Sequence, residues 1–300
     1  MDLREYILIT PCKNEEDSLP KHIESVINQT IKPVLWVIVD DGSTDKTPRI
    51  LKEVTGVYPW IKTLGLSEIP RDLGIHVAQV YRTGFQYTID FCKNNNIIFN
   101  YIGVVDADII LDLNYFESLI AEFEKNSQIG ICSGHIGNMV NGKVIWSSFK
   151  EDMPSGGARL WRKKCFEDTD GYILTCSPDS VSNVKAKLKG WSTKQFNHIK
   201  AVSTRPYASA EGQWIGYKKL GLNNYFIGYT PIHILLKGTK LMYSTNGYYK
   251  PGAGLAYIIG YFSGYVKKAP RLDDKEVIKY YKTRGKNILC STLKLHRKTK

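Results

Sequence analysis

Two aspartates one residue apart, Asp106 and Asp108, are the strongest chemical signal in the sequence. They follow a short apolar run, residues 101–105, which predicts a buried strand. Ligands of open α/β sheets collect beyond the carboxyl ends of the strands, and Mg²⁺ and Mn²⁺ prefer carboxylate and phosphate oxygens. The pair therefore predicts a divalent cation held against a phosphate-bearing ligand. Two simpler alternatives are that Asp108 begins a turn, or that one aspartate caps the helix expected near Leu113.

The segments before this pair alternate between apolar runs, which predict strands, and apolar residues at helical spacing, which predict helices. Strands are expected at 6–10, 34–39, 61–64 and 101–105, and helices at 19–27, 50–54 and 77–91. We expect Asp17 or Ser18 to cap the first helix and Ser43 or Thr44 to cap the second. This order predicts an α/β protein with a mostly parallel central sheet flanked by helices.

The pattern changes after Asp108. A helix is expected at 116–123, and strands at 129–136 and 144–148 are joined by Asn141-Gly142, a hairpin signal. These strands predict a mixed extension of the sheet. Residues 154–158 contain two consecutive glycines, which predicts a loop where the backbone approaches another group closely.

Length and composition limit the class of protein. The 300 residues suit one large domain or two coupled ones. Six cysteines without a C-x-x-C pair argue against a zinc knuckle or a disulfide framework and are typical of a reducing cytosol. We expect no signal peptide, because Asp2, Arg4 and Glu5 interrupt any apolar run, and no spanning helix. Residues 241–300 hold 13 Lys/Arg and 3 Asp/Glu, so this tail carries +10 of the net charge of +12.

Five motifs in order resemble those of family 2 glycosyltransferases, over about residues 5–240. They are Ile-Thr-Pro-Cys-Lys-Asn-Glu-Glu at 9–16, Val-Ile-Val-Asp-Asp-Gly-Ser-Thr-Asp at 37–45, Asp-Ala-Asp at 106–108, Gly-Ala-Arg-Leu-Trp-Arg at 157–162 with Asp-Gly-Tyr at 170–172, and Pro-Asp at 178–179 with Gly-Trp at 190–191. The resemblance implies a GT-A-type, Rossmann-like fold. It also implies a UDP- or GDP-linked nucleotide-sugar donor, Mn²⁺ or Mg²⁺, and inversion at the anomeric carbon.

The resemblance also implies a role for each matching residue. Five residues would bind the nucleotide-sugar donor. The backbone of Thr10 and Pro11 would face the nucleobase, and Asp41 would accept from a uracil or guanine N–H. Glu15 would lie near the nucleoside and Asp106 near the ribose. Asp108 would bind the metal, Asp179 would be the catalytic base, and Gly157, Ala158 and Trp191 would lie on the acceptor side.

The chemistry requires these roles. A nucleoside diphosphate leaves easily only when its charge is neutralised, which a metal on Asp108 would do. The acceptor hydroxyl is a weak nucleophile until a carboxylate takes its proton, and that base must lie across the sugar from the phosphate. Asp179 satisfies this requirement by belonging to a distant segment, although it also suits an N-cap after Pro178.

Four weaker candidates remain beyond these motifs. His198 resembles a histidine that reaches the metal or diphosphate in several relatives, with a loop or half-buried histidine as the alternative. Arg205 would hold a phosphate bidentately, or simply be solvated at the surface. Lys13, Arg71 and His76 are further phosphate candidates, for which an exposed charge is the simpler expectation.

Residues 253–266 form an apolar, Tyr-rich run followed by Lys267, Lys268 and Arg271. The run is too short to span a bilayer, and this composition is typical of an amphipathic helix at an anionic membrane surface. The alternatives are packing on the catalytic domain or a homo-oligomer contact. We therefore expect three parts: a nucleotide-sugar half (1–110), an acceptor-binding and catalytic half (111–240), and a membrane-associating or oligomerising tail (241–300). The enzyme would be cytoplasmic and peripheral, acting on a glycan or lipid-linked acceptor.

The sequence fits two other functions less well than it fits a glycosyltransferase. A sugar-phosphate nucleotidyltransferase needs a Gly-rich loop after the first strand, and residues 11–18 contain no glycine. A nucleic-acid-binding protein would suit the pI of 9.2, but the charge is confined to the tail and no recognition motif is present. We therefore expect no nucleic-acid partner.

Overall fold

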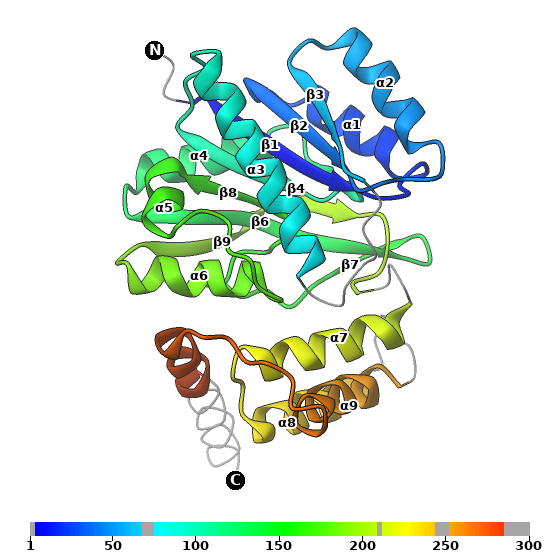
Figure 1. Cartoon of the computed structure of the whole chain (residues 1–300), viewed down its shortest axis with the longest axis vertical. Helices are drawn as coiled ribbons and strands as arrows, with labels where there is room; N and C mark the ends of the chain where they lie inside the picture. The colour runs from blue at the N-terminus through cyan, green and yellow to red at the C-terminus, as the bar shows by residue number, and fades with distance from the viewer. Residues whose placement is uncertain (1–3, 68–74, 209–211, 244–251, 285–300) are drawn as a thin grey trace. The chain divides into compact units, whose positions relative to one another are not determined.

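The computed structural model describes residues 4–67, 75–208, 212–243 and 252–284 (Figure 1). The chain forms two compact units, the first ending at Arg205 and the second beginning at Pro206, with residues 175–177 counted in the second.

The first unit is built on a mixed sheet of nine strands. In chain order these are β1 (Tyr6–Cys12), β2 (Leu35–Asp40), β3 (Ile61–Gly65), β4 (Tyr101–Val105), β5 (Ile109–Leu111), β6 (Ile129–Val140), β7 (Lys143–Trp146), β8 (Ala158–Arg162) and β9 (Ser192–Ser203). The spatial order is β3-β2-β1-β4-β8-β6-β9-β5, with β7 paired to β6. Strands β3, β2, β1 and β4 are parallel, so their carboxyl ends share one edge. The alternation of strands and helices therefore predicted this half of the sheet correctly.

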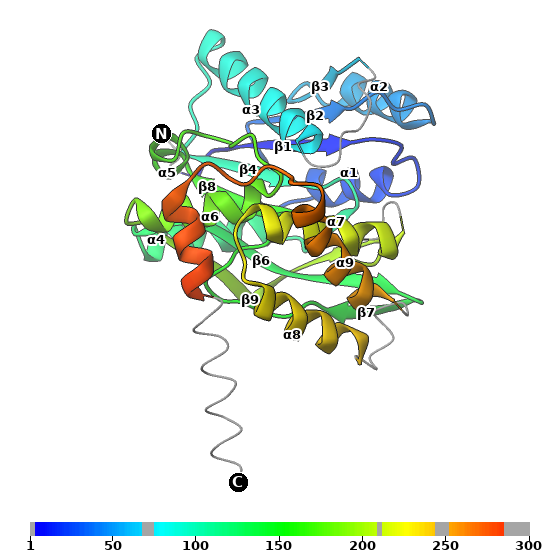
Figure 2. The ribbon, with the colours of Figure 1, turned by 60° about the horizontal axis from the view of Figure 1, so that its bottom comes forward.

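Helices cover both faces of this sheet. Successive side chains of a strand point to opposite faces, so neighbouring residues of β1 contact different helices. Tyr6 and Leu8 pack with α1 (Leu19–Ile27), α2 (Thr47–Val57) and α4 (Tyr115–Lys125). Ile7 and Ile9 point the other way, toward α3 (His76–Asn94), α5 (Lys163–Asp168) and α6 (Pro178–Leu188). Figure 2 shows α3 and α1 on opposite sides of β1.

The second half of the sheet is the predicted mixed extension, with β8 antiparallel to β4 and β6. The predicted hairpin at Asn141-Gly142 joins β6 to β7. Strands β5, β8 and β9 were not predicted from the sequence, and Ala158, the first residue of β8, was expected in a loop. β5 has only three residues, and β9 mixes buried, half-buried and exposed residues without a regular period.

The predicted cap of the second helix was wrong. Residue 46 precedes α2, and Ser43 and Thr44 serve a different purpose. The Ser43 hydroxyl accepts a hydrogen bond from the Asn14 backbone at 2.9 Å, and the Thr44 backbone donates to the Asn14 side chain at 2.8 Å. These bonds join the loop after β1 to the loop after β2. Ser18 precedes α1 as expected, but its hydroxyl binds Glu15 and makes no cap.

The second unit consists of α7 (Gln213–Phe226), α8 (Pro231–Met242), α9 (Ala253–Val266) and a helical segment at 275–284. The helices pack closely: a Cβ at Gly260 of α9 would strike the Lys218 carbonyl of α7. Tyr217, Tyr257 and Tyr261 lie buried between them. Helices α7 and α8 therefore pack with α9, although the charge pattern divides the sequence at 241. Among the described residues, no helix combines the length and apolar character needed to cross a bilayer.

Candidate active site

Asp106 follows the carboxyl end of β4 and is half-buried in the first unit. Its backbone N–H donates to the Gly157 carbonyl at 2.8 Å, and its side chain accepts a hydrogen bond from the Tyr81 hydroxyl of α3. The pKa of the Asp106 carboxyl is raised from 3.8 to about 7, first by burial and then by the charge of Asp108. Asp179 raises this pKa further, whereas the Tyr81 hydrogen bond lowers it. Several carboxyl groups are thus crowded at this edge of the sheet.

Asp108 lies in a turn, because the Ile109 N–H donates to the Asp106 carbonyl at 3.0 Å. Its Oδ2 atom accepts from the Ser203 hydroxyl of β9 at 2.9 Å and from Arg205 Nε at 2.8 Å. The same guanidinium donates to Glu15 Oε1 at 2.7 Å. The turn alternative and the binding role are therefore compatible, and Arg205 joins Glu15 to Asp108.

Asp179 lies in the first turn of α6. It is directly against residues 154–158, which we call the glycine loop. A Cβ at Gly156 would overlap the Asp179 carboxylate, and a Cβ at Gly157 would lie 2.9 Å from Asp106 Oδ2. The predicted close approach of backbone at this loop is confirmed. The Tyr172 hydroxyl lies 3.5 Å from Asp179 Oδ1. The Tyr172 ring stacks on the ring of Tyr81, whose hydroxyl binds Asp106. The loop thus lies between the two carboxylates.

Arg159 holds the loop and the start of α6 together. It is fully buried on β8, and its guanidinium donates to the carbonyls of Ser155 at 2.7 Å and Pro154 at 2.8 Å. It also lies 3.3 Å from the Asp179 carbonyl and from the Asn183 side chain. A buried guanidinium needs several acceptors, and here two carbonyls of the loop and two groups of α6 supply them.

The expected donor residues at the ends of β1 and β2 lie at the same edge. Asp41 is buried and binds His76 Nε2 at 2.8 Å and Lys13 Nζ at 3.4 Å. His76 and Lys13 were expected to be exposed charges, and both are instead largely buried partners of Asp41. Arg71 lies outside the described residues.

Thr10 and Pro11 form the last part of β1. The Thr10 side chain is fully buried and turned away from the edge: its hydroxyl accepts from Trp36 Nε1 at 3.0 Å and lies 3.2 Å from His22 Nε2. Only its backbone therefore remains for the expected role toward a base. Pro11 is half-buried, one residue before the strand ends.

Two expected site residues lie elsewhere. The side chain of His198 is 65% exposed, with Nε2 3.7 Å from Glu122 of α4, because β9 bulges between the residues paired with Gly134 and His135. Trp191 follows the far end of α6 and donates to Asp168 at 3.1 Å. An eleven-residue helix is roughly 16 Å long, so Trp191 is separated from Asp179 by the length of α6. The structure therefore does not bring either side chain to the aspartates.

Ala158 is fully buried where β8 begins, and its carbonyl accepts from the Tyr115 hydroxyl at 2.9 Å. It pairs with Val105 and so fixes where the glycine loop leaves the sheet. Ala158 was expected on the acceptor side. Because its side chain is buried, it positions the glycine loop.

Four residues beyond those predicted contribute to the site: Tyr81, Gly156, Arg159 and Ser203. Gly156 lies in the loop expected from its consecutive glycines, but the sequence did not indicate that Asp179 is the group it approaches. Arg159 lies inside a family motif, and nothing local distinguishes it from its neighbours. Ser203 is two residues from Arg205 and Tyr81 is on a helical face read as core. Only the pairing of β5 with β9 and of α3 with the sheet brings them to the aspartates.

The donor set suits a hard divalent cation. Asp106 and Asp108 interact electrostatically, and the guanidinium of Arg205 joins Asp108 to the carboxylate of Glu15. Within the described residues, no three His, Cys, Asp or Glu side chains form a preformed metal cage. A bound Mn²⁺ or Mg²⁺ would therefore take some of its ligands from Asp108 and others from phosphate oxygens, which is usual for Mg²⁺ sites.

Comparison with known proteins identifies the family. Residues 7–179, more than half of the chain, match the model of glycosyl transferase family 2. The glycosyltransferase GlyA of Streptococcus pneumoniae is 31% identical over 126 residues, covering 41% of this chain and 16% of that protein. The chondroitin synthase of Escherichia coli is 23% identical over 230 residues, covering 72% of this chain and 31% of that protein. The chain thus spans about a third or less of the length of these two relatives.

Solved structures show the same fold. Residues 1–349 of S. aureus TarS with UDP-GlcNAc superpose with a TM-score of 0.53 at 14% identity, covering 91% of this chain and 78% of that one. A mannosyltransferase from Pyrobaculum calidifontis with GDP-Man and Mn²⁺ gives 0.52 at 12% identity, covering 97% and 80%. The predicted GT-A fold is therefore confirmed. With the family match and the ordered motifs, these findings show that the chain belongs to the family 2 glycosyltransferases.

Proposed function

We propose that this protein transfers a sugar from a UDP- or GDP-linked donor to a hydroxyl acceptor, with inversion at the anomeric carbon. The observation that carries the proposal is the position of Asp179. Its carboxylate lies against Gly156, on a different segment from Asp106 and Asp108, so a base and a phosphate-binding group flank one loop. Two solved structures with the same fold hold UDP-GlcNAc or GDP-Man with Mn²⁺, which supports this class of donor.

The donor would occupy the edge formed by the ends of β1, β2 and β4. In this proposal residues 1–110 supply Glu15, Asp41, Asp106 and Asp108, and residues 111–240 supply Asp179 and Arg205. Asp41 would accept a hydrogen bond from an N–H of the uracil or guanine ring. This bond would replace one of its contacts with His76 and Lys13. When bound on Asp108, Mn²⁺ or Mg²⁺ would neutralise the charge of the diphosphate. Arg205 would hold a phosphate oxygen.

Transfer itself needs one proton acceptor. The acceptor oxygen attacks the anomeric carbon, the bond from that carbon to the diphosphate oxygen breaks, and the nucleoside diphosphate leaves with both electrons of that bond. Asp179 takes the proton of the attacking hydroxyl. A single displacement inverts the anomeric configuration, because the nucleophile enters opposite the leaving group. The acceptor would be a glycan or a lipid-linked hydroxyl.

The test is to replace Asp179 with Asn. The expected result is unchanged affinity for the nucleotide sugar and a transfer rate reduced by roughly 10²–10⁴-fold, the usual contribution of a general base. Glu167→Gln is the matched control, because Glu167 is an exposed acid on α5, outside the five motifs. Transfer by Asp179→Asn within a few-fold of the wild type would exclude Asp179 as the base. Release of pyrophosphate would instead indicate a nucleotidyltransferase.

A further inference from the structure

Helices α8 and α9 of the second unit each expose an apolar stripe. On α8 the stripe includes Ile232, Leu235 and Leu236, and on α9 it includes Leu255, Ile259 and Phe262, all between 36% and 57% exposed. On each helix these spacings of three and four residues place the side chains on one face. We call the two stripes together the α8–α9 apolar face.

The two stripes lie on helices that contact each other. A Cβ at Gly254 of α9 would lie 2.7 Å from Met242 Cγ of α8, and Ile258 of α9 packs against Gly238 of α8. Met242 is itself 43% exposed, so apolar surface continues from one helix to the other. Figure 1 shows the two helices beside each other. Exposed apolar patches of this kind mark interaction sites.

The charge around this face has a single sign. The described part of residues 212–272 contains seven Lys/Arg and no Asp or Glu, and the acids Asp273, Asp274 and Glu276 follow it. Lys240 is exposed on α8, and Lys267 and Lys268 follow α9 directly and are exposed. Arg271 is held over the rings of Tyr225 and Tyr265, 4.4 Å and 5.2 Å from their centroids. Any partner of this face must therefore accept apolar side chains and carry negative charge.

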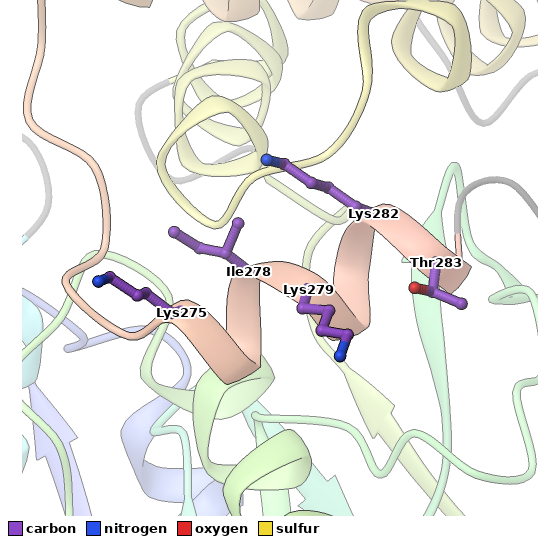
Figure 3. A pocket seen from close by; sticks show the side chains of 5 residues that line it. All are labelled: Lys275, Ile278, Lys279, Lys282 and Thr283. Carbon is purple, nitrogen blue, oxygen red and sulfur yellow. The ribbon is translucent and has the colours of Figure 1, made fainter.

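Further positive charge comes from the helical segment at 275–284. Lys275, Lys279 and Lys282 line a surface pocket of about 480 Å³ with Ile278 and Thr283. Figure 3 shows Lys279 pointing away from Lys275 and Lys282, so the three ammonium groups do not converge on one anion. The pocket is therefore a source of positive potential and not a separate site.

We propose that the α8–α9 apolar face docks on the surface of a lipid bilayer that carries anionic headgroups. The fourteen residues of α9 are about 21 Å long, short of the roughly 30 Å hydrocarbon core, so α9 would lie in the interface. Lys/Arg beside the face would meet the headgroups, and the exposed Tyr265 would sit at their level. A second copy of this chain suits the face less well, because two surfaces of net positive charge would repel each other.

This inference goes beyond sugar transfer and does not depend on it. Together with the proposed function, it places the acceptor at the membrane, with a lipid-linked hydroxyl as the favoured substrate. The docking test uses no sugar nucleotide, so a failure of docking and a failure of transfer are distinguishable.

The test is sedimentation of the full chain with phosphatidylcholine vesicles, with and without phosphatidylglycerol. Binding to the anionic vesicles is expected to weaken about tenfold or more in Leu236→Ser/Ile259→Ser. It is also expected to weaken in Lys240→Gln/Lys267→Gln/Lys268→Gln. High salt should reduce the binding of the wild type without abolishing it, because only the electrostatic part is screened.

The matched control is Val57→Ser/Leu113→Ser, which removes two apolar side chains exposed by 68% and 62% in the first unit. This control should bind vesicles like the wild type, and circular dichroism and thermal unfolding check that all variants fold. Wild-type binding by Leu236→Ser/Ile259→Ser would overturn the proposal, as would absence of binding by the wild type. Equal binding to neutral vesicles would overturn the headgroup contact. A dimer that Leu236→Ser/Ile259→Ser dissociates would assign the face to a second copy instead.

Discussion

The Nε atom of Arg205 lies 2.8 Å from Oδ2 of Asp108. The same guanidinium lies 2.7 Å from Glu15 Oε1, so one arginine neutralises part of two carboxylates at the edge where the donor is expected. A metal ion bound by Asp108 would meet this guanidinium as a competing cation. The structure therefore relates the affinity for a metal to the position of Arg205.

The first prediction concerns this competition. In Arg205→Gln, the affinity of the nucleotide-free protein for Mn²⁺ is expected to rise several-fold, because a positive charge next to Asp108 is removed. Affinity for UDP or GDP is expected to fall by about tenfold or more, since a charge-assisted hydrogen bond contributes about 1.5–3 kcal/mol. Calorimetric titration of Mn²⁺ with and without nucleotide measures both effects. Unchanged Mn²⁺ affinity in the free variant would mean that Arg205 does not compete at Asp108.

The second prediction separates two expected metal ligands. Asp108→Asn should lose Mn²⁺-dependent binding of the nucleotide, because an amide brings no charge to the cation. His198→Ala is the matched control and should bind as the wild type does, because His198 is exposed beside Glu122. A thermal-shift series with nucleotide, with and without Mn²⁺, reports both variants. Loss of the Mn²⁺ effect in His198→Ala would restore His198 as a ligand.

The third prediction concerns the glycine loop. Gly156→Ala adds a Cβ where the Asp179 carboxylate lies, so either the loop or the carboxylate must move. Transfer should fall by roughly 10²-fold, the effect expected from misplacing a catalytic group by about 1 Å, with little change in nucleotide affinity. Gly56→Ala serves as the control, because a Cβ at this position in α2 has no atom within 4 Å. Normal turnover by Gly156→Ala would show that the position of Asp179 is not critical.

The fourth prediction is a pH dependence of stability caused by His22. Burial lowers the pKa of the His22 imidazole from 6.5 to about 4, although a hydrogen bond to the Ile109 carbonyl and the charge of Asp108 raise it. Folded His22 therefore stays neutral between about pH 6.5 and about pH 4, where the unfolded chain binds a proton. In this window His22 makes the free energy of unfolding increase with pH, by up to about 1.4 kcal/mol per unit, and this stability is lost on acidification.

His22→Gln keeps a donor for the Ile109 carbonyl and an acceptor for Thr10 but does not titrate. Urea unfolding at about pH 5 and at about pH 7 compares the two proteins. The wild type should lose more stability than His22→Gln between these values, by roughly 2 kcal/mol. An equal loss in both proteins would show that His22 titrates normally in the folded state.

Much of the fold follows from local pattern. The apolar runs before Pro11, Asp41 and Asp106 are continuous because parallel strands are buried on both faces. The order of these strands along the chain and the α/β class could therefore be predicted from the sequence. That the three acidic segments after these runs form one site could also be predicted, because parallel strands bring their carboxyl ends to one edge of the sheet. Gly156-Gly157 was readable because consecutive glycines mark a close backbone approach.

The tertiary structure alone decided which side chains meet. Ser203 and Arg205 reach Asp108 because β9 pairs with β5, a contact between segments almost a hundred residues apart that no local period encodes. His198 and Trp191 matched the expected sequence positions, but a bulge in β9 and the length of α6 carry them away from the site. Local pattern determines the faces and ends of elements through short-range geometry. Strand pairing over long separations depends on the packing of the whole unit, and it determines the site.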